Sequence, residues 1–327
     1  MIIISSKKYP KKLGETDALF WSEDIAEEVS VVKGLSMYFK GGVGSGITGH
    51  RTFRAKPSSL RSAKSREDLP KHCQKLAIPP AWTDLMYNPD VKGDLLVTGK
   101  AKNGKTQYVY SEQFKAQQAE AKFARVLELQ NKYQSTVTEN QKNRKSSDLK
   151  TKENADCLAT VMNTGIRAGS ETDTGVEKKA FGVTTLKGEH VKEVNGVVHL
   201  VFGGKSGVSQ NLQVSKADVG EMLLSRAKVA GKNGNLFDTD DSSLRKYSKT
   251  LDGGGFKTKD FRTLLATNEA EKAVKAFGGK RPTSEKEYKA MVKEVGKAVA
   301  AKLGNTVTVA LQSYVYPGVF SRWRAAI

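Results

Sequence analysis

Cysteine and histidine are scarce in this chain of 327 residues. The two cysteines, Cys73 and Cys157, lie far apart, which excludes a disulfide framework and favours a reducing, cytosolic type of compartment. The four histidines form no cluster with zinc-binding spacing. No apolar run approaches the roughly 20 residues of a membrane-spanning helix, and the stretch 1–4 is too short for a signal-peptide core. We therefore expect a cytoplasmic protein without a membrane span.

Acidic residues are also in short supply. There are 54 Lys and Arg residues against 35 Asp and Glu, which gives a formal net charge of +19. This excess is larger than solubility requires and predicts a polyanionic partner, either nucleic acid or an anionic membrane surface. Hydrophobic residues make up 38% of the chain and aromatic residues 8%, so the chain is not of the disordered type. Its 327 residues are enough for two domains.

The N-terminal third divides into an extension and a small β-rich unit. A glycine-rich segment, 41–46, closes an extension over 1–45 whose role the sequence does not reveal. The segment 47–77 carries eight basic and two acidic residues, which fits a solvated basic face and a phosphate-tracking patch equally well. Asn103-Gly104 lies between two alternating apolar runs and predicts a β-hairpin. We expect a β-rich domain over 46–114.

The rest of the chain has mostly helical patterns. After Phe114 the apolar residues recur at spacings of three and four, so a helix is expected to begin there. The polar segment 134–154 is expected to form an exposed helix end and a loop, followed by a short buried helix over 155–163. We therefore expect a second, mostly α-helical domain over 115–327, and an α+β protein as a whole.

Two further patterns predict a β-hairpin and a long amphipathic helix in this second domain. Strands are expected over 197–201 and 210–214, with a glycine-rich turn between them. A capping box at Ser284–Glu287 is expected to open an amphipathic helix that stops at Gly304. The helical domain should therefore carry a β-hairpin.

Several familiar chemistries are absent from the sequence. Gly204-Lys205-Ser206 ends like a nucleotide-binding loop, but His199 occupies the position of its first glycine. The segment 238–241 is interpreted as a turn rather than a two-metal site. We therefore expect neither a nucleotide nor a metal cofactor. What remains is Arg167, Lys205 and Arg262, each in an unusual local setting, and Tyr314 near the C-terminus; each alone is typical of a surface charge or of packing.

Six separated blocks, in this order, resemble the type IB DNA topoisomerases, specifically their small poxvirus-like and bacterial branch. The resemblance covers about residues 45 to 322. The blocks are LAIPPAW with TGKAKNGKTQYVY, EAKFARVL, GIRAGSE with FGVTTLKGEHV, VFGGKSG, FKTKDFRTLLAT and LGNTVTVALQSYVYP.

The resemblance implies a catalytic role for each of the basic residues and for one tyrosine. Tyr314 would be the nucleophile and form a 3′-phosphotyrosyl link, while Arg167 and Arg262 would clamp the scissile phosphate. Lys205 would be the general acid for the 5′-oxygen, and Lys259 matches a further basic active-site residue of the family. This assignment agrees with the chemistry, because a phenol ester conserves the bond energy and two arginine forks match the charge of the transition state without a metal.

Other positions carry weaker implications. Asn305 stands where relatives usually have His, so it can donate a hydrogen bond but cannot carry charge. Tyr316 is a competing phenol, and Tyr314 is favoured because it keeps the spacing of the family. Gln107, Tyr108 and Tyr110 match the place where small topoisomerases contact bases in the major groove, although a plain aromatic strand face is the alternative.

Three functional hypotheses follow. The leading one is a type IB topoisomerase that closes as a monomeric clamp around double-stranded DNA, nicks one strand, permits rotation and reseals. A tyrosine site-specific recombinase shares the same residue types, but typically has His-x-x-Arg where this chain has Lys259–Arg262. A basic chromatin-type DNA binder with a decayed active site is the non-enzymatic alternative. DNA is the expected partner in all three cases, with no membrane and no nucleotide.

Overall fold

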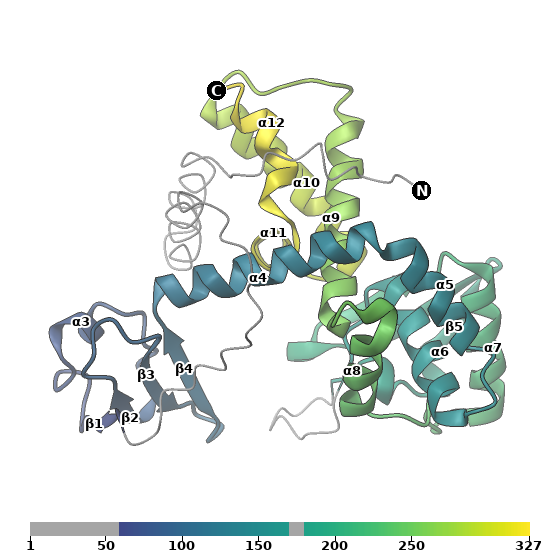
Figure 1. Ribbon diagram of the computed structural model, residues 1–327, viewed down its shortest axis with the longest axis horizontal. Helices are drawn as coiled ribbons and strands as arrows, with labels where there is room; N and C mark the ends of the chain where they lie inside the picture. Colours follow the sequence, from purple (N-terminus) through teal and green to yellow (C-terminus); the bar gives the residue numbers. More distant parts are fainter. Residues whose placement is uncertain (1–58, 170–179) are drawn as a thin grey trace. The chain divides into compact units, whose positions relative to one another are not determined.

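The computed structural model describes residues 59–169 and 180–327 (Figure 1). The expected extension 1–45 and the first part of the basic segment, 47–58, lie outside these residues. The described chain forms two compact units, one ending at Ala121 and the other starting at Lys122. This boundary falls within helix α4, Glu112–Asn131. The domain bounds expected at 46–114 and 115–327 stay predictions.

The N-terminal unit is built on an antiparallel sheet with strand order β1-β2-β3-β4. The predicted hairpin is present: β3 and β4 pair antiparallel, and Gly104 takes a φ of 74° in the turn between them. Strand β2 was not predicted. One face of the sheet packs on a small core that includes Cys73 and Val97. The elements are β1 Arg61–Ser62, α3 Lys71–Gln74, β2 Thr83–Tyr87, β3 Leu95–Lys100 and β4 Thr106–Tyr110.

The C-terminal unit is mostly helical (Figure 1), and it contains a second hydrophobic core that includes Cys157 and Leu264. The predicted α+β class, with a β-rich N-terminal part and a helical part that carries a hairpin, is confirmed. Its helices are α5 Tyr133–Asn143, α6 Leu149–Thr164, α7 Ala217–Ala230, α8 Asp241–Thr250, α9 Thr258–Ala276, α10 Glu285–Leu303, α11 Val307–Tyr314 and α12 Ser321–Arg324.

The segment 134–154 holds the expected helix end and loop, but the loop is short: it spans 144–148, and the rest is helix. Helix α6 begins early because the side chain of Asp148 accepts a hydrogen bond from the backbone N–H of Thr151 at 2.9 Å and caps it. Polar residues are also buried in α5. Asn140 is 2% exposed; its amide donates to the Ala155 carbonyl at 3.0 Å and its Oδ1 accepts from the Tyr247 hydroxyl at 2.8 Å. These tertiary hydrogen bonds stabilise a helix that its own sequence does not mark as buried.

A second antiparallel sheet, of order β5-β6-β7, carries the predicted hairpin. Its strands are β5 Val191–Val194, β6 Val197–Gly203 and β7 Ser209–Gln213. The last pair of the hairpin is Gly203 with Ser209, and the turn beyond it contains Lys205–Gly207. Alternation along β7 turns Gln210 and Leu212 inward.

Helix α10 follows its predicted bounds. The Ser284 hydroxyl accepts from the Glu287 N–H at 3.2 Å at its start, which is half of the predicted capping box, whereas the Glu287 carboxylate accepts from the Thr283 N–H at 2.8 Å. At its end Gly304 takes the left-handed conformation with φ of 60°. The backbone angle favours glycine, and a Cβ at Gly304 would lie 2.1 Å from Oε1 of Gln210 and displace that amide. This turn delivers the chain to Asn305 and then to α11.

Candidate active site

Tyr314 is the last residue of α11 and is 6% exposed. Helix α11 begins at the cap residue Thr306, whose hydroxyl accepts from the Val309 N–H at 3.3 Å. At the other end Thr267 of α9 fixes the main chain on both sides of the bend. Its hydroxyl donates to the Tyr314 carbonyl at 3.3 Å and accepts from the Tyr316 N–H at 3.2 Å. The position of the phenol is therefore set by α9 as well as by its own helix.

Two cations of α9 lie over the Tyr314 ring. The guanidinium carbon of Arg262 is 4.9 Å from the ring centroid, and the Lys259 Nζ is 5.4 Å from it. Burial raises the pKa of the Tyr314 phenol, but the positive charges of Arg262, Arg167 and Lys259 outweigh burial and hold that pKa below its usual value. The site therefore eases loss of the phenol proton, and a phenolate is a stronger nucleophile than a phenol.

Arg262 is 2% exposed and is held mainly by backbone carbonyls. Its Nη1 donates to the Gly165 carbonyl, and its Nη2 donates to the Leu303 carbonyl at 2.8 Å. Burial, with Arg167 nearby, lowers the pKa of Arg262 to about 10 against the opposing effect of Tyr314. The guanidinium therefore stays charged at neutral pH, and its buried Nε has no hydrogen-bond partner among the described residues.

Asn305 joins the two arginines. Its Oδ1 accepts from Nη2 of Arg167 at 2.8 Å and from Nη2 of Arg262 at 3.2 Å. Its Nδ2 is buried and has no hydrogen-bond partner among the described residues. A buried amide that makes bonds on one side only is costly unless a ligand supplies the other partner. Residues 138 apart in the sequence, Arg167 and Asn305, thus form one polar cluster.

Arg167 reaches this cluster through a sharp turn at the end of α6. Gly165 caps the helix with φ of 69°, and a Cβ there would lie 2.8 Å from a methyl of Leu303. Only glycine avoids both the backbone strain and the clash. The turn lets the chain leave the core after one buried residue, Ile166, and places the partly exposed Arg167 beside Asn305.

Lys205 is placed differently from the other expected residues. It lies exposed at the tip of the β6–β7 hairpin, and the structure gives its side chain no hydrogen-bond or ion-pair partner within 59–169 and 180–327. The base of the hairpin is fixed by Gln210, which is 3% exposed and donates from Nε2 to the Gly304 carbonyl at 3.0 Å. The hairpin is therefore attached next to Asn305 while its tip presents Lys205 to solvent.

Tyr316 and the expected base-contacting tyrosines have their own aromatic contacts. The Tyr316 ring packs 5.5 Å, centroid to centroid, from Phe123. In the N-terminal unit, Tyr108 is 54% exposed and stacks with Tyr110 on one face of β4 at 6.2 Å. Gln107 lies on the opposite face of that strand, because side chains alternate along it.

Sequence reasoning missed three residues that touch the site. Gln210 connects the hairpin to Gly304, Lys122 donates to the Ser313 carbonyl at 3.2 Å, and Arg125 pairs with Asp260. A signal existed for Gln210 alone, because it is a polar residue at an inward position of an alternating strand.

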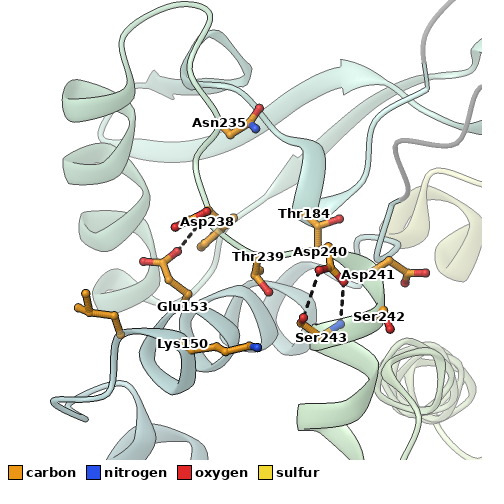
Figure 2. A pocket seen from close by; sticks show the side chains of 12 residues that line it. Lys150, Glu153, Thr184, Asn235, Asp238, Thr239, Asp240, Asp241, Ser242 and Ser243 are labelled. Carbon is orange, nitrogen blue, oxygen red and sulfur yellow. Dashed lines mark hydrogen bonds between the residues drawn. The ribbon is translucent and has the colours of Figure 1, made fainter.

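A cavity of about 710 Å³ lies elsewhere in the C-terminal unit (Figure 2). Its lining is rich in acidic side chains, among them Glu153, Asp238, Asp240 and Asp241. Asp240 accepts from the Ser243 N–H at 2.8 Å and caps α8, as Figure 2 shows. Carboxylates repel phosphate, so this cavity does not suit a DNA backbone. None of its lining residues belongs to the cluster around Tyr314.

Comparisons with known proteins agree with the resemblance of the sequence blocks. The family described as "Eukaryotic DNA topoisomerase I, catalytic core" matches residues 111–316. A protein of Acanthamoeba polyphaga mimivirus named "DNA topoisomerase 1B" is 28% identical over 263 residues, which cover 74% of this chain and 76% of the viral protein.

Proposed function

Because the chain belongs to the type IB DNA topoisomerases, the family of the eukaryotic topoisomerase I catalytic core, we propose that the cluster around Tyr314 is its active site. The enzyme acts on double-stranded DNA. In the proposed reaction the Tyr314 oxygen attacks the scissile phosphorus, a 3′-phosphotyrosyl bond forms and the 5′-oxygen leaves. Rotation of the free end follows, and attack by the 5′-hydroxyl reverses the step without an external energy source.

One observation carries this proposal. The guanidinium of Arg262 lies over the Tyr314 ring and shares the Asn305 oxygen with Arg167. A phosphate that accepts hydrogen bonds from both arginines would therefore lie beside the phenol that attacks it. Charged forks of fixed geometry stabilise the developing negative charge of a pentavalent phosphate, because they need no reorganisation when the charge appears.

Asn305 takes the place of the histidine that relatives usually carry. Its Oδ1 orients the two arginines, and its unpartnered Nδ2 is a donor for a non-bridging phosphate oxygen. An amide does not titrate, so this position contributes no pH dependence to the reaction.

The leaving oxygen needs a proton, and we assign this role to Lys205. A lysine on an exposed hairpin tip is able to approach DNA that the rest of the unit has bound. Lys259 lies over the Tyr314 ring, and we assign it to stabilising the phenolate. The comparisons favour this topoisomerase over the tyrosine recombinase.

We also propose that the enzyme works as a monomeric clamp without nucleotide, and that Gln107, Tyr108 and Tyr110 contact DNA. The net charge of +19 supplies the attraction to the phosphate backbone. Among the described residues, no helix is both long and apolar enough to cross a membrane.

The decisive experiment is relaxation of supercoiled plasmid in EDTA without ATP. We expect the wild type to relax the plasmid, because arginines rather than a metal carry the charge stabilisation. Tyr314→Phe removes the attacking oxygen and should leave no relaxation and no covalent adduct. Tyr316→Phe is the matched control and should keep both. Relaxation by Tyr314→Phe, or a strict Mg²⁺ requirement for cleavage, would contradict the proposal.

A further inference from the structure

A lysine outside the expected catalytic set touches the chain next to Tyr314. Lys122 of α4 is partly buried, and its Nζ donates to the carbonyl of Ser313 at 3.2 Å. The next residue, Phe123, packs its ring against Tyr316 at 5.5 Å. Two successive residues of α4 thus contact the chain on either side of Tyr314. Lys122 and Ser313 are 191 residues apart in the sequence.

Helix α4 is also fastened to the start of α9. Arg125 lies one turn after Lys122, and its Nε and Nη2 donate to the two carboxylate oxygens of Asp260 at 3.0 and 3.3 Å. The side chain of Asp260 is 2% exposed and also accepts from the Lys257 N–H at 2.9 Å. A buried bidentate pair of this kind has one well-defined geometry. Because Asp260 is two residues before Arg262, α4 is held to the helix that carries the phosphate-binding arginine.

We propose that Lys122 is a positioning residue for Tyr314, whose ammonium group holds the last turn of α11 so that the phenol meets the phosphate bound by Arg262. This inference rests on the proposed function of Tyr314. It extends the active site to α4, which contacts the tyrosine segment through Lys122 and Phe123 and contacts α9 through Arg125.

The Lys122 ammonium lies 3.9 Å from the centroid of the Phe123 ring, but its burial and its charged neighbours oppose its charge. Burial lowers its pKa to about 7, with help from the charges of Lys259 on α9 and Arg125 on α4, while Asp260 acts in the opposite direction. The unfolded chain holds this proton up to pH ~10.4. Folding therefore becomes less favourable as the pH falls from about 10 to about 7, and the cost is fully present below pH 7. A methionine of similar length would avoid this cost.

The ammonium form makes the stronger contact with Ser313. The Ser313 carbonyl belongs to the last turn of α11, where the helix dipole is negative, and a charged donor binds such an oxygen more strongly than a neutral amine does. The positioning effect should therefore be largest below about pH 7 and weaken above it.

The test measures single-turnover formation of the covalent adduct on duplex DNA at saturating protein, at pH 6 and pH 8.5. Lys122→Met keeps the stem and removes the ammonium. Lys228→Met, at an exposed lysine of α7, removes the same charge elsewhere and is the matched control. We expect Lys122→Met to form adduct about 10- to 100-fold more slowly at pH 6, because small misplacements of reacting groups cost rates of this order. The deficit should shrink at pH 8.5, and DNA affinity should change no more than in Lys228→Met.

The unfolding temperature of the variant distinguishes a positioning role of Lys122 from a role in packing. Lys122→Met should unfold at a higher temperature than the wild type at pH 6, because it no longer buries a charge. A second variant, Lys122→Gln, keeps a hydrogen-bond donor without a charge. At pH 6 it should form adduct more slowly than the wild type but faster than Lys122→Met.

Three results would each overturn the inference. These are wild-type rates in Lys122→Met, a deficit equal at both pH values, and a lowered melting temperature that accompanies the deficit. A failure of the proposed function looks different, because the wild type would then form no adduct or Tyr314→Phe would form one.

Discussion

The guanidinium carbon of Arg262 lies 4.9 Å from the centroid of the Tyr314 ring, so the proposed phosphate-binding group and the proposed nucleophile are in contact. The contact is set by the scaffold, because the same guanidinium donates to the carbonyls of Gly165 and Leu303. Arg262 therefore has little freedom to move. The positive charge that lowers the pKa of the Tyr314 phenol is held in place by the fold. Four measurements examine this arrangement and its surroundings.

Asn305→Asp should slow adduct formation by about 10²- to 10³-fold, the range for loss of one preorganised group. A carboxylate at this position would neutralise Arg167 and Arg262, which both donate to the Asn305 oxygen, and would repel the phosphate. Asn305→His installs the residue usual among relatives and should stay active. Single-turnover cleavage of duplex DNA measures both. A wild-type rate in Asn305→Asp would show that the two arginines do not bind the scissile phosphate in this geometry.

Lys205→Ala should lose about 10²- to 10⁴-fold in cleavage rate, the usual contribution of a general acid. A substrate with sulfur at the 5′-bridging position should restore the rate, because a thiolate leaves without a proton. Arg262→Ala should stay slow on the sulfur substrate, since its task is charge stabilisation. The comparison is the single-turnover rate of adduct formation on the two substrates. If sulfur does not rescue Lys205→Ala, Lys259 becomes the candidate for the general acid.

Relaxation should depend steeply on salt. A clamp that neutralises many phosphates releases their counterions, so its affinity falls linearly with the logarithm of the salt concentration. At low salt, slow release should make relaxation processive; at higher salt it should become distributive. Gel analysis of topoisomer distributions over time distinguishes the two modes. A rate and mode that do not respond to salt would argue against clamp binding.

Glu271→Met should stabilise the protein at pH 8 and not at pH 4.5. Glu271 of α9 is 8% exposed, its Oε1 has no hydrogen-bond partner among the described residues, and burial raises its pKa to about 7 against the opposing charge of Lys275. A raised carboxyl pKa means that stability is lost as the pH rises from about 4.5 through 7, which amounts to an upper limit of about 3 kcal/mol.

Thermal unfolding at pH 4.5 and pH 8 measures this effect. Glu294→Met, at an exposed position on α10, is the control and should show no such difference between the two pH values. An equal effect of Glu271→Met at both pH values would mean that Glu271 is already ionised at pH 4.5.

Local signals in the sequence predict the elements that local chemistry stabilises. The turn at Asn103-Gly104 gave the β3–β4 hairpin, and the capping box at Ser284 gave the start of α10. The extent and burial of helix α5 are not predicted because they depend on distant partners: buried Asn140 is bonded to Ala155 and Tyr247, neither of which its own segment contains. Propensity and periodicity carry no information about such contacts.

The candidate site shows the same division. Arg167, Arg262 and Tyr314 are predicted from sequence blocks that resemble the family, and the structure brings them together with Asn305. Lys122 was not found, because nothing in its own helix indicates that it reaches Ser313. Supporting residues of a site are recognised by their partners rather than by their own sequence context.

Each of the two units carries one of the two cysteines in its core, and this gives the protein an internal reporter of local opening. Cys73 and Cys157 are both 0% exposed, and burial raises the pKa of both thiols. A thiol reagent therefore labels Cys73 only when the N-terminal unit opens and Cys157 only when the C-terminal unit opens. Labelling rates read by peptide mass, with and without DNA, would measure the opening free energy of each unit separately in the unmodified chain.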